Sequence, residues 1–151
     1  MRWMCVILVA AAIGIGGCSR SEEPQAKSPS GVDGGAPAGH AGKGIGPVQQ
    51  VELGPIDDAM AEKGKAAFEQ KCAACHRFDE RFVGPPLKGV TERRKPEWIM
   101  NMILNPVEMT QKDPQAKELL GTYLTQMTFQ NVSQEEARAI LEYFRKLDGA
   151  S

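Results

Sequence analysis

Residues 72–76 read CAACH, two cysteines separated by two residues and followed at once by a histidine. Such a stretch can be a redox dithiol, part of a zinc site, or a covalent haem site. A dithiol of the thioredoxin type needs a βαβ context, and structural zinc needs four ligands. The surrounding domain has no strand pattern and offers only three zinc ligands. The spacing therefore predicts haem attachment through Cys72 and Cys75, with His76 as an iron ligand.

The composition restricts the class of protein further. The chain has 151 residues, of which 42% are hydrophobic and 6% aromatic, and its formal net charge is −1. No basic excess is available to neutralise phosphates, so nucleic-acid binding is not expected. The length fits one domain with additional segments. The low aromatic content leaves room for an apolar cofactor in the core.

The N-terminus has the pattern of an export signal. Arg2 precedes an apolar stretch at 4–15, which is shorter than the roughly 20 residues of a membrane-spanning helix. Residues 15–18 read IGGC and resemble a bacterial lipobox. The resemblance implies that the signal peptide, residues 1–17, is removed and that Cys18 is acylated. Acyl chains would then anchor the protein to a membrane.

Residues 18–54 are predicted to be a lipid-anchored flexible linker. Ser19–Gly54 contains eight glycines, four prolines and no aromatic residue, a composition that cannot bury enough surface to order itself. A Gly-rich coil of this length spans roughly 30–36 Å. His40 is expected to be a solvated linker residue. The protein would face the periplasm, where Ser19 weakly favours the outer membrane, or the outer face of the cell membrane.

Residues 55–149 are predicted to form an all-α domain of about four short helices. Asp57 or Asp58 can cap the first helix, and Ser133 with Glu136 forms a capping box before the last. Gly64 is expected to mark a close helix contact. The helices are expected at 59–72, 96–104, 114–120 and 133–147, with long loops at 75–90 and 105–113, and Gly121 is expected to end the third helix.

The domain resembles the monohaem class I c-type cytochromes. The residues that carry the resemblance are Gly64, Phe68, CAACH at 72–76, GPPL at 84–87, a methionine ahead of the last helix, and Tyr143. The resemblance implies a cytochrome c fold around one covalent haem c. The first and last helices would cross, with Gly64 and Phe68 against Tyr143 or Phe144. The carbonyl of Pro85 or Pro86 would accept a hydrogen bond from Nδ1 of His76.

The resemblance also implies a methionine as the second axial ligand. Met127 lies six residues before Ser133 and matches the family position. Met109, in the expected loop at 105–113, is the alternative. Met100 and Met102 are better explained by packing in a short apolar helix. The family often has a proline beside this methionine, whereas Gln126 and Thr128 flank Met127.

Ligation by histidine and methionine leaves no open position on the iron, which predicts a one-electron carrier and not an enzyme. The expected partner is a respiratory redox enzyme, a terminal oxidase or a nitrogen-oxide reductase. Two alternatives are a haem sensor whose methionine yields to a gas, and a peroxidase, which would need a second haem or distal acid–base groups that the sequence does not show.

Two further sets of residues have open interpretations. Trp98 and Tyr123 either donate to a haem propionate or are plain core aromatics. Residues 77–95 hold six basic and three acidic side chains. This stretch, from Arg77 to Lys95, is either a docking surface for an acidic redox partner or an ordinary solvated face.

Overall fold

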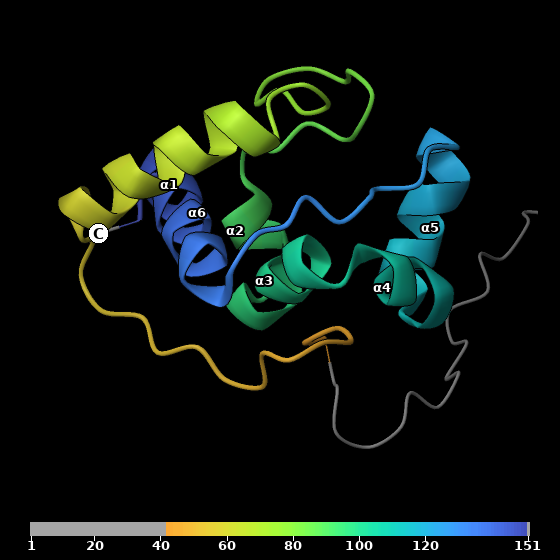
Figure 1. Cartoon of the computed structure of the whole chain (residues 1–151), viewed down its shortest axis with the longest axis horizontal. Coiled ribbons are helices and arrows are strands. Elements are labelled where there is room, and N and C mark those ends of the chain that lie inside the picture. Colours follow the sequence, from red (N-terminus) through yellow and green to blue (C-terminus); the bar gives the residue numbers. More distant parts are fainter. Residues whose placement is uncertain (1–41, 151) are drawn as a thin grey trace, which may run out of the picture. The chain divides into compact units, whose positions relative to one another are not determined.

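The computed structural model describes residues 42–150, and in that range it contains six helices and no strand (Figure 1). The predicted all-α fold is confirmed, but about four helices was too few. The helices are α1 (Asp58–Lys71), α2 (Val90–Arg93), α3 (Pro96–Leu104), α4 (Pro106–Lys112), α5 (Pro114–Tyr123) and α6 (Gln134–Leu147). The predicted signal peptide at 1–17, Cys18, Ser19 and His40 lie outside the described residues.

Helices α1 and α6, far apart in the sequence, cross one another (Figure 1). Asp57 caps α1 by accepting from the Met60 amide at 2.9 Å, and the Ser133–Glu136 capping box opens α6 as predicted. A Cβ atom at Gly64 would lie 1.9 Å from the carbonyl oxygen of Ala139. The close helix contact expected at Gly64 is therefore confirmed.

Aromatic rings complete this crossing. The ring of Phe68 lies 5.9 Å from that of Tyr143 and 5.7 Å from that of Phe144, measured between centroids. Both alternatives from the sequence therefore hold, although Phe144 is the buried residue, 5% exposed, of the pair. Phe78, from the loop after α1, joins the cluster at 5.0 Å from Phe68. The cluster joins the loop that follows CAACH to both helices.

Two boundaries differ from the prediction. The expected loop at 105–113 contains α4, because Pro106 at its first position needs no amide partner and is already set for helical φ. Helix α5 does not end at Gly121 but continues to Tyr123, and Leu124 closes it with φ 53°. A glycine lowers helix stability but does not forbid the helical conformation, so α5 can continue through Gly121.

Residues 42–54 pack onto the helical domain, which corrects the predicted linker boundary at Gly54. Val48 is 3% exposed, and its amide donates to Oδ1 of Asn101 in α3 at 2.9 Å. Nδ2 of Asn101 donates to the carbonyls of Lys43 at 3.0 Å and Val48 at 2.8 Å. Asn101 therefore uses both ends of its amide to hold this segment, and residues 42–54 belong to the folded domain and not to the linker.

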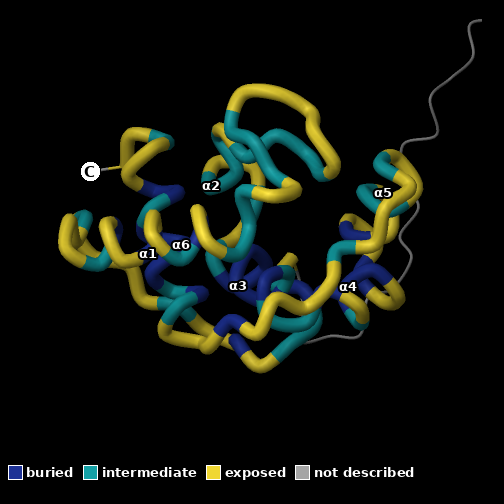
Figure 2. The backbone as a smooth tube through the Cα atoms, turned by 45° about the horizontal axis from the view of Figure 1, so that its top comes forward, coloured by how far each residue is buried: buried dark blue, intermediate teal, exposed yellow. Residues whose placement is uncertain are grey.

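The core is made mainly by α3, α4 and α6, where buried residues cluster (Figure 2). Glu142 of α6 is also completely buried, where it accepts from the Asp57 amide at 3.0 Å and pairs with Arg138 and Arg145. Arg145 in turn donates to the carbonyl of Gly54 at 2.8 Å. Across residues 42–150, none of the helices is both long and apolar enough to cross a membrane.

Candidate haem site

CAACH continues the last turn of α1. The amide of Cys72 donates to the carbonyl of Phe68 at 2.8 Å, and the amide of His76 donates to that of Cys72 at 3.0 Å. Both cysteines have free thiols, with Cys72 half-buried and Cys75 exposed. Because the turn bends back on itself, both thiols and the His76 ring line one cavity.

The GPPL loop, residues 84–87, contacts the imidazole of His76 and fixes its orientation. Nδ1 of His76 lies 3.2 Å from the carbonyl oxygen of Pro85, so Pro85 is the acceptor among the two prolines predicted. With Nδ1–H donating to that oxygen, Nε2 is left as a bare acceptor. A Cβ atom at Gly84 would lie 2.5 Å from Cε1 of the ring. Only glycine lets the loop approach this closely, so Gly84 and Pro85 together fix the ring's position.

The electrostatics favour a neutral imidazole and a protonated thiol. Burial lowers the pKa of His76, and the bond to the Pro85 carbonyl only partly offsets it. Metal ligation needs this neutral form. Burial also raises the pKa of the Cys72 thiol to about 11, with smaller effects from Lys71 and Cys75. Catalytic dithiols have lowered thiol pKa values, so the site does not suit the redox-dithiol alternative.

Met127 lies far from CAACH in the sequence, in the segment ahead of α6. It nevertheless lines the same cavity as Cys72, Cys75 and His76. The cavity has a volume of about 450 Å³, within the range of roughly 300–1,000 Å³ that holds cofactor-sized ligands. Apolar side chains form most of the remaining wall: Leu87, Ile99, Met102, Ile103, Leu119, Leu120 and Phe144. Two thiols, a neutral imidazole, a thioether and an apolar wall fit a covalently bound haem.

Met109, the alternative ligand, is not part of this cavity's wall. It lies in α4, is 0% exposed, and its Sδ accepts from the Ile45 amide at 2.9 Å. Its thioether is thus occupied by the segment at 42–54. Met100 is 2% exposed, in keeping with core packing, whereas Met102 lines the cavity.

Trp98 and Tyr123 both line the cavity, but their polar groups differ in use. Nε1 of Trp98 donates to Oδ1 of Asp113 at 3.0 Å. Asp113 is 7% exposed and also caps α5. Of the two interpretations of Trp98, the buried bond to Asp113 favours a core aromatic over a propionate donor. The ring of Tyr123 lies under the guanidinium of Arg81, 4.5 Å from its centroid.

A zinc site finds no support in the described part of the chain. No group of three or more histidine, cysteine, aspartate or glutamate side chains is placed there to hold a metal ion.

The sequence did not identify Thr110 and Gln126 as part of the site. Both line the cavity, and Oγ1 of Thr110 donates to Oε1 of Gln126 at 2.8 Å. The only sequence signal was the position of Gln126 next to Met127. The apolar wall from α3 could have been found from the spacing of Trp98 and Met102, four residues apart on one face.

Known proteins match this domain. The family model for cytochrome c matches residues 61–148. The solved structure of cytochrome c from Rhodothermus marinus is 51% identical, with a TM-score of 0.68, and the match covers 70% of this chain and 92% of that one.

Two curated relatives match shorter stretches. A cytochrome c-553-like protein of Synechocystis sp. is 32% identical over 69 residues, and cytochrome c-551 of Stutzerimonas stutzeri is 46% identical over 39 residues. These stretches are 42% and 25% of this chain, and 66% and 38% of the relatives' own lengths. The family carries a covalent haem c and transfers electrons between redox proteins. With CAACH in place and the fold matched, this chain belongs to the cytochrome c family.

Proposed function

We propose that this protein is a one-electron carrier in which Cys72 and Cys75 bind haem c covalently and His76 and Met127 are the two axial ligands. The observation that supports this assignment is that all four side chains line one apolar cavity. Bound haem c would supply the one-electron couple. The chain supplies the two thiols for attachment, orients the imidazole through Pro85 and surrounds the group with a mostly apolar wall.

The ligand set supports a carrier over a sensor or an enzyme. With both axial positions filled, no site remains for a substrate or a gas, and thioether ligation raises the reduction potential. Met109 is unsuited to exchange with Met127, since it is buried in α4 and bonded to Ile45. The wall is mostly apolar, without the distal acid–base pair that peroxidase chemistry would require.

We also propose that the partner is a respiratory redox enzyme, a terminal oxidase or a nitrogen-oxide reductase, that presents an acidic surface. Of the basic side chains in Arg77–Lys95, three line the cavity, Lys88, Arg93 and Arg94. Arg81, Lys88 and Arg93 are exposed. Lys88 is paired with Asp79 at 3.2 Å, so Arg81 and Arg93 carry more of the uncompensated charge. Such charges steer transient encounters more than they add affinity.

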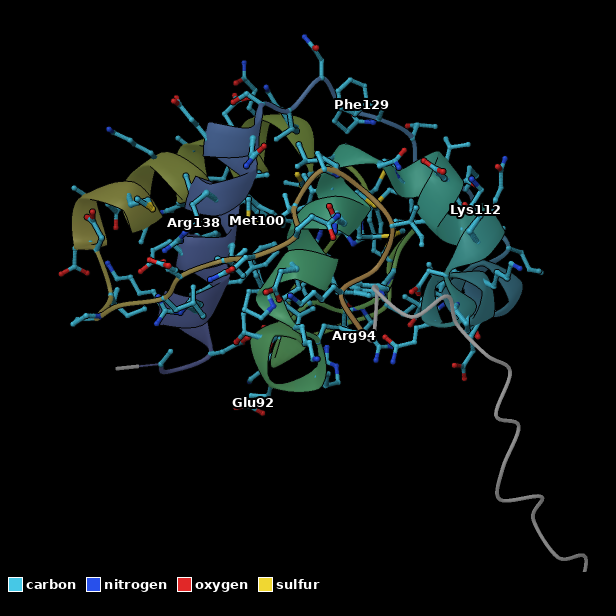
Figure 3. The ribbon with its side chains drawn as sticks, turned by 90° about the horizontal axis from the view of Figure 1, so that it is seen from below. Glu92, Arg94, Met100, Lys112, Phe129 and Arg138 are labelled. Carbon is cyan, nitrogen blue, oxygen red and sulfur yellow. The ribbon has the colours of Figure 1, made fainter. Side chains whose placement is uncertain are left out.

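Exposed apolar residues accompany this charge. Phe82 is 49% exposed, Leu124 84% and Phe129 53%. Phe129 points outward from the segment that carries Met127 (Figure 3). Apolar groups beside a charged rim are typical of the centre of a protein interface. The proposed docking surface therefore consists of loop 77–95 and segment 124–133.

The proposed location is outside the cytoplasm, as for bacterial cytochromes c in general. An acylated Cys18 after removal of residues 1–17 would tether the domain to a membrane. This part rests on the IGGC pattern and on the principle that several acyl chains give stable anchoring.

The axial assignment is tested with carbon monoxide and the absorption spectrum of the purified haem protein. The wild type is expected to show a methionine–iron charge-transfer band when oxidised and to bind carbon monoxide slowly when reduced. Met127→Ala should lose the band and bind carbon monoxide rapidly, whereas Met109→Leu should keep the band. Rapid binding by the wild type would favour the sensor, and a band that survives in Met127→Ala would exclude Met127 as the ligand.

A further inference from the structure

We propose that Gln126 is a positioning residue that holds Met127 at the haem by bridging it to Thr110 in α4. Its side-chain amide joins the Met127 carbonyl to the Thr110 hydroxyl, an arrangement called here the Gln126 bridge. The inference rests on the proposed function, because it takes Met127 as the axial ligand.

Each end of the Gln126 side-chain amide makes one hydrogen bond. Nε2 of Gln126 donates to the carbonyl oxygen of Met127 at 2.8 Å, and Oε1 accepts from Oγ1 of Thr110 at 2.8 Å. Thr110 is 5% exposed, and all three residues line the cavity. The bridge therefore runs from a rigid, buried helix position to the main chain of the ligand residue itself.

The hydrogen-bonding chemistry allows only one orientation of the amide. The Met127 carbonyl can only accept, so the NH₂ group must face it and Oε1 must face Thr110. The Thr110 hydroxyl also lies 3.0 Å from the Pro106 carbonyl and 2.9 Å from that of Val107. It has a single proton, while helix carbonyls already accept main-chain amides. Donation to Gln126 therefore satisfies the otherwise unpaired Oε1 without leaving those carbonyls unsatisfied.

The ligand segment, residues 124–131, is bonded to a helix at each of its ends. At one end the Leu124 amide donates to the Leu120 carbonyl at 2.8 Å, and at the other Lys71 donates to the Asn131 carbonyl at 3.0 Å. Within the described chain, the Thr110–Gln126 bond is the only one that joins residues 125–130 to another element. The chain also has no proline after Pro114, so no ring restricts φ in this segment.

The bridge therefore controls how often the ligand segment opens. A thioether that leaves the iron exposes an axial position, and the segment can swing away only after the bridge breaks. One neutral hydrogen bond shifts such an equilibrium about two- to tenfold. Losing the bridge should raise the population of open protein by that factor while the closed structure stays the same.

The test compares variants of the purified haem protein with the wild type. Gln126→Leu and Thr110→Val each remove one end of the bridge, and the double variant removes both. Gln130→Leu is the matched control, because Gln130 makes the same kind of bond, at 2.8 Å, but only to Thr128 within the segment. Gln126 is exposed, so its replacement leaves the core intact.

Two measurements report on opening: the rate of carbon monoxide binding to the reduced protein, and the alkaline pH at which the methionine–iron band disappears. Gln126→Leu and Thr110→Val should each raise the rate about two- to tenfold and lower that pH. The double variant should equal the single ones, because both remove one bridge. Thr110→Ser retains the hydroxyl. Its carbon monoxide binding rate and the pH at which its band disappears should therefore be close to those of the wild type.

The idea is overturned if Gln126→Leu behaves like Gln130→Leu, or if the effects of the two single variants add. Met127→Ala separates this failure from failure of the axial assignment. If that variant loses the band while Gln126→Leu leaves opening unchanged, only the bridge is wrong. If Met127→Ala keeps the band, the ligand itself has been misassigned.

Discussion

Gly64 in α1 touches the main-chain carbonyl of Ala139 in α6, and a Cβ atom at position 64 would come within 1.9 Å of that oxygen. Nothing flexible can yield at this contact, because the opposing atom belongs to the backbone of a helix. The crossing that fixes CAACH at the end of α1 thus depends on a missing side chain.

Replacing Gly64 with alanine should therefore force the two helices apart. The expected loss in the free energy of unfolding is about 1–3 kcal/mol, against a helix-propensity gain of at most about 1 kcal/mol. Gly121→Ala is the matched control, since Gly121 also lies in a helix but a Cβ there would meet nothing within 4 Å. The control should gain stability in denaturant unfolding. Equal effects of the two variants would contradict the close packing.

Gly84→Ala should disturb the imidazole of His76. Its Cβ would lie 2.5 Å from Cε1 of the ring, so either the ring or the GPPL loop must move. We expect a loss of about 1–3 kcal/mol in stability and an altered haem spectrum and reduction potential. Gly54→Ala, where a Cβ has open space, serves as control. An unchanged spectrum and potential in Gly84→Ala would show that the ring does not rely on this contact.

Glu142→Gln should destabilise the protein in a pH-dependent way. Burial alone would raise the pKa of Glu142, but the Asp57 amide, Arg138 and Arg145 outweigh it and hold the pKa below its ordinary value of 4.5. A lowered pKa contributes stability that is complete above the ordinary value and is lost as the pH falls through the folded one. The variant should lose about 1.5–3 kcal/mol near neutral pH.

The difference between wild type and Glu142→Gln should shrink below a pH of about 4.5, which urea unfolding across a pH series can measure. Glu118→Gln, on the exposed face of α5, should change stability by no more than about 0.5 kcal/mol at any pH. A difference that stays constant down to strongly acid pH would mean that the carboxylate charge contributes nothing.

Arg93→Glu should slow electron transfer to an acidic partner at low ionic strength. The rate constant is expected to fall about threefold to tenfold and its dependence on salt to weaken, because steering acts through unscreened charge. Lys63→Glu is the control, because it makes the same change in net charge at a different place. Lys63 lies on α1 and lines another cavity, together with Val48 and Met60. If both variants slow the reaction equally, net charge rather than the proposed surface is responsible.

Cys18→Ser should move the protein from the membrane fraction to the soluble fraction. The serine hydroxyl cannot take the place of the thiol in lipid attachment, so the acyl chains that hold the protein are lost. Fractionation and intact mass report the result, and the haem spectrum should stay that of the wild type. A variant that stays in the membrane fraction would rule out the anchor at this position.

Local chemistry made much of the fold predictable. Caps at Asp57 and Ser133, and proline at the first turn of α3, act within a few residues, so the sequence pattern reveals them. CAACH is equally local. The same locality misled at Asn105–Pro106, where a proline that ends one helix also begins α4.

The remaining features depend on residues far apart in the chain. Asn101 holds Val48 across 53 residues, and Ile45 reaches Met109 across 64. A Gly-rich segment shows no periodicity that would indicate such contacts, so the composition of residues 42–54 predicted a linker. The Thr110–Gln126 bond spans 16 residues and was hidden for the same reason.

The docked segment at 42–54 also decides where the proposed anchor would pull on the domain. It begins beneath α3, whereas the loop after α1 rises on the opposite side (Figure 1). With the proposed anchor, a pull on the chain ahead of residue 42 would reach α3 through the bonds of Asn101 to Lys43 and Val48. Among the described residues, no hydrogen bond joins 42–54 to the GPPL loop or to residues 125–130, so such a pull would not act directly on Pro85 or on Gln126.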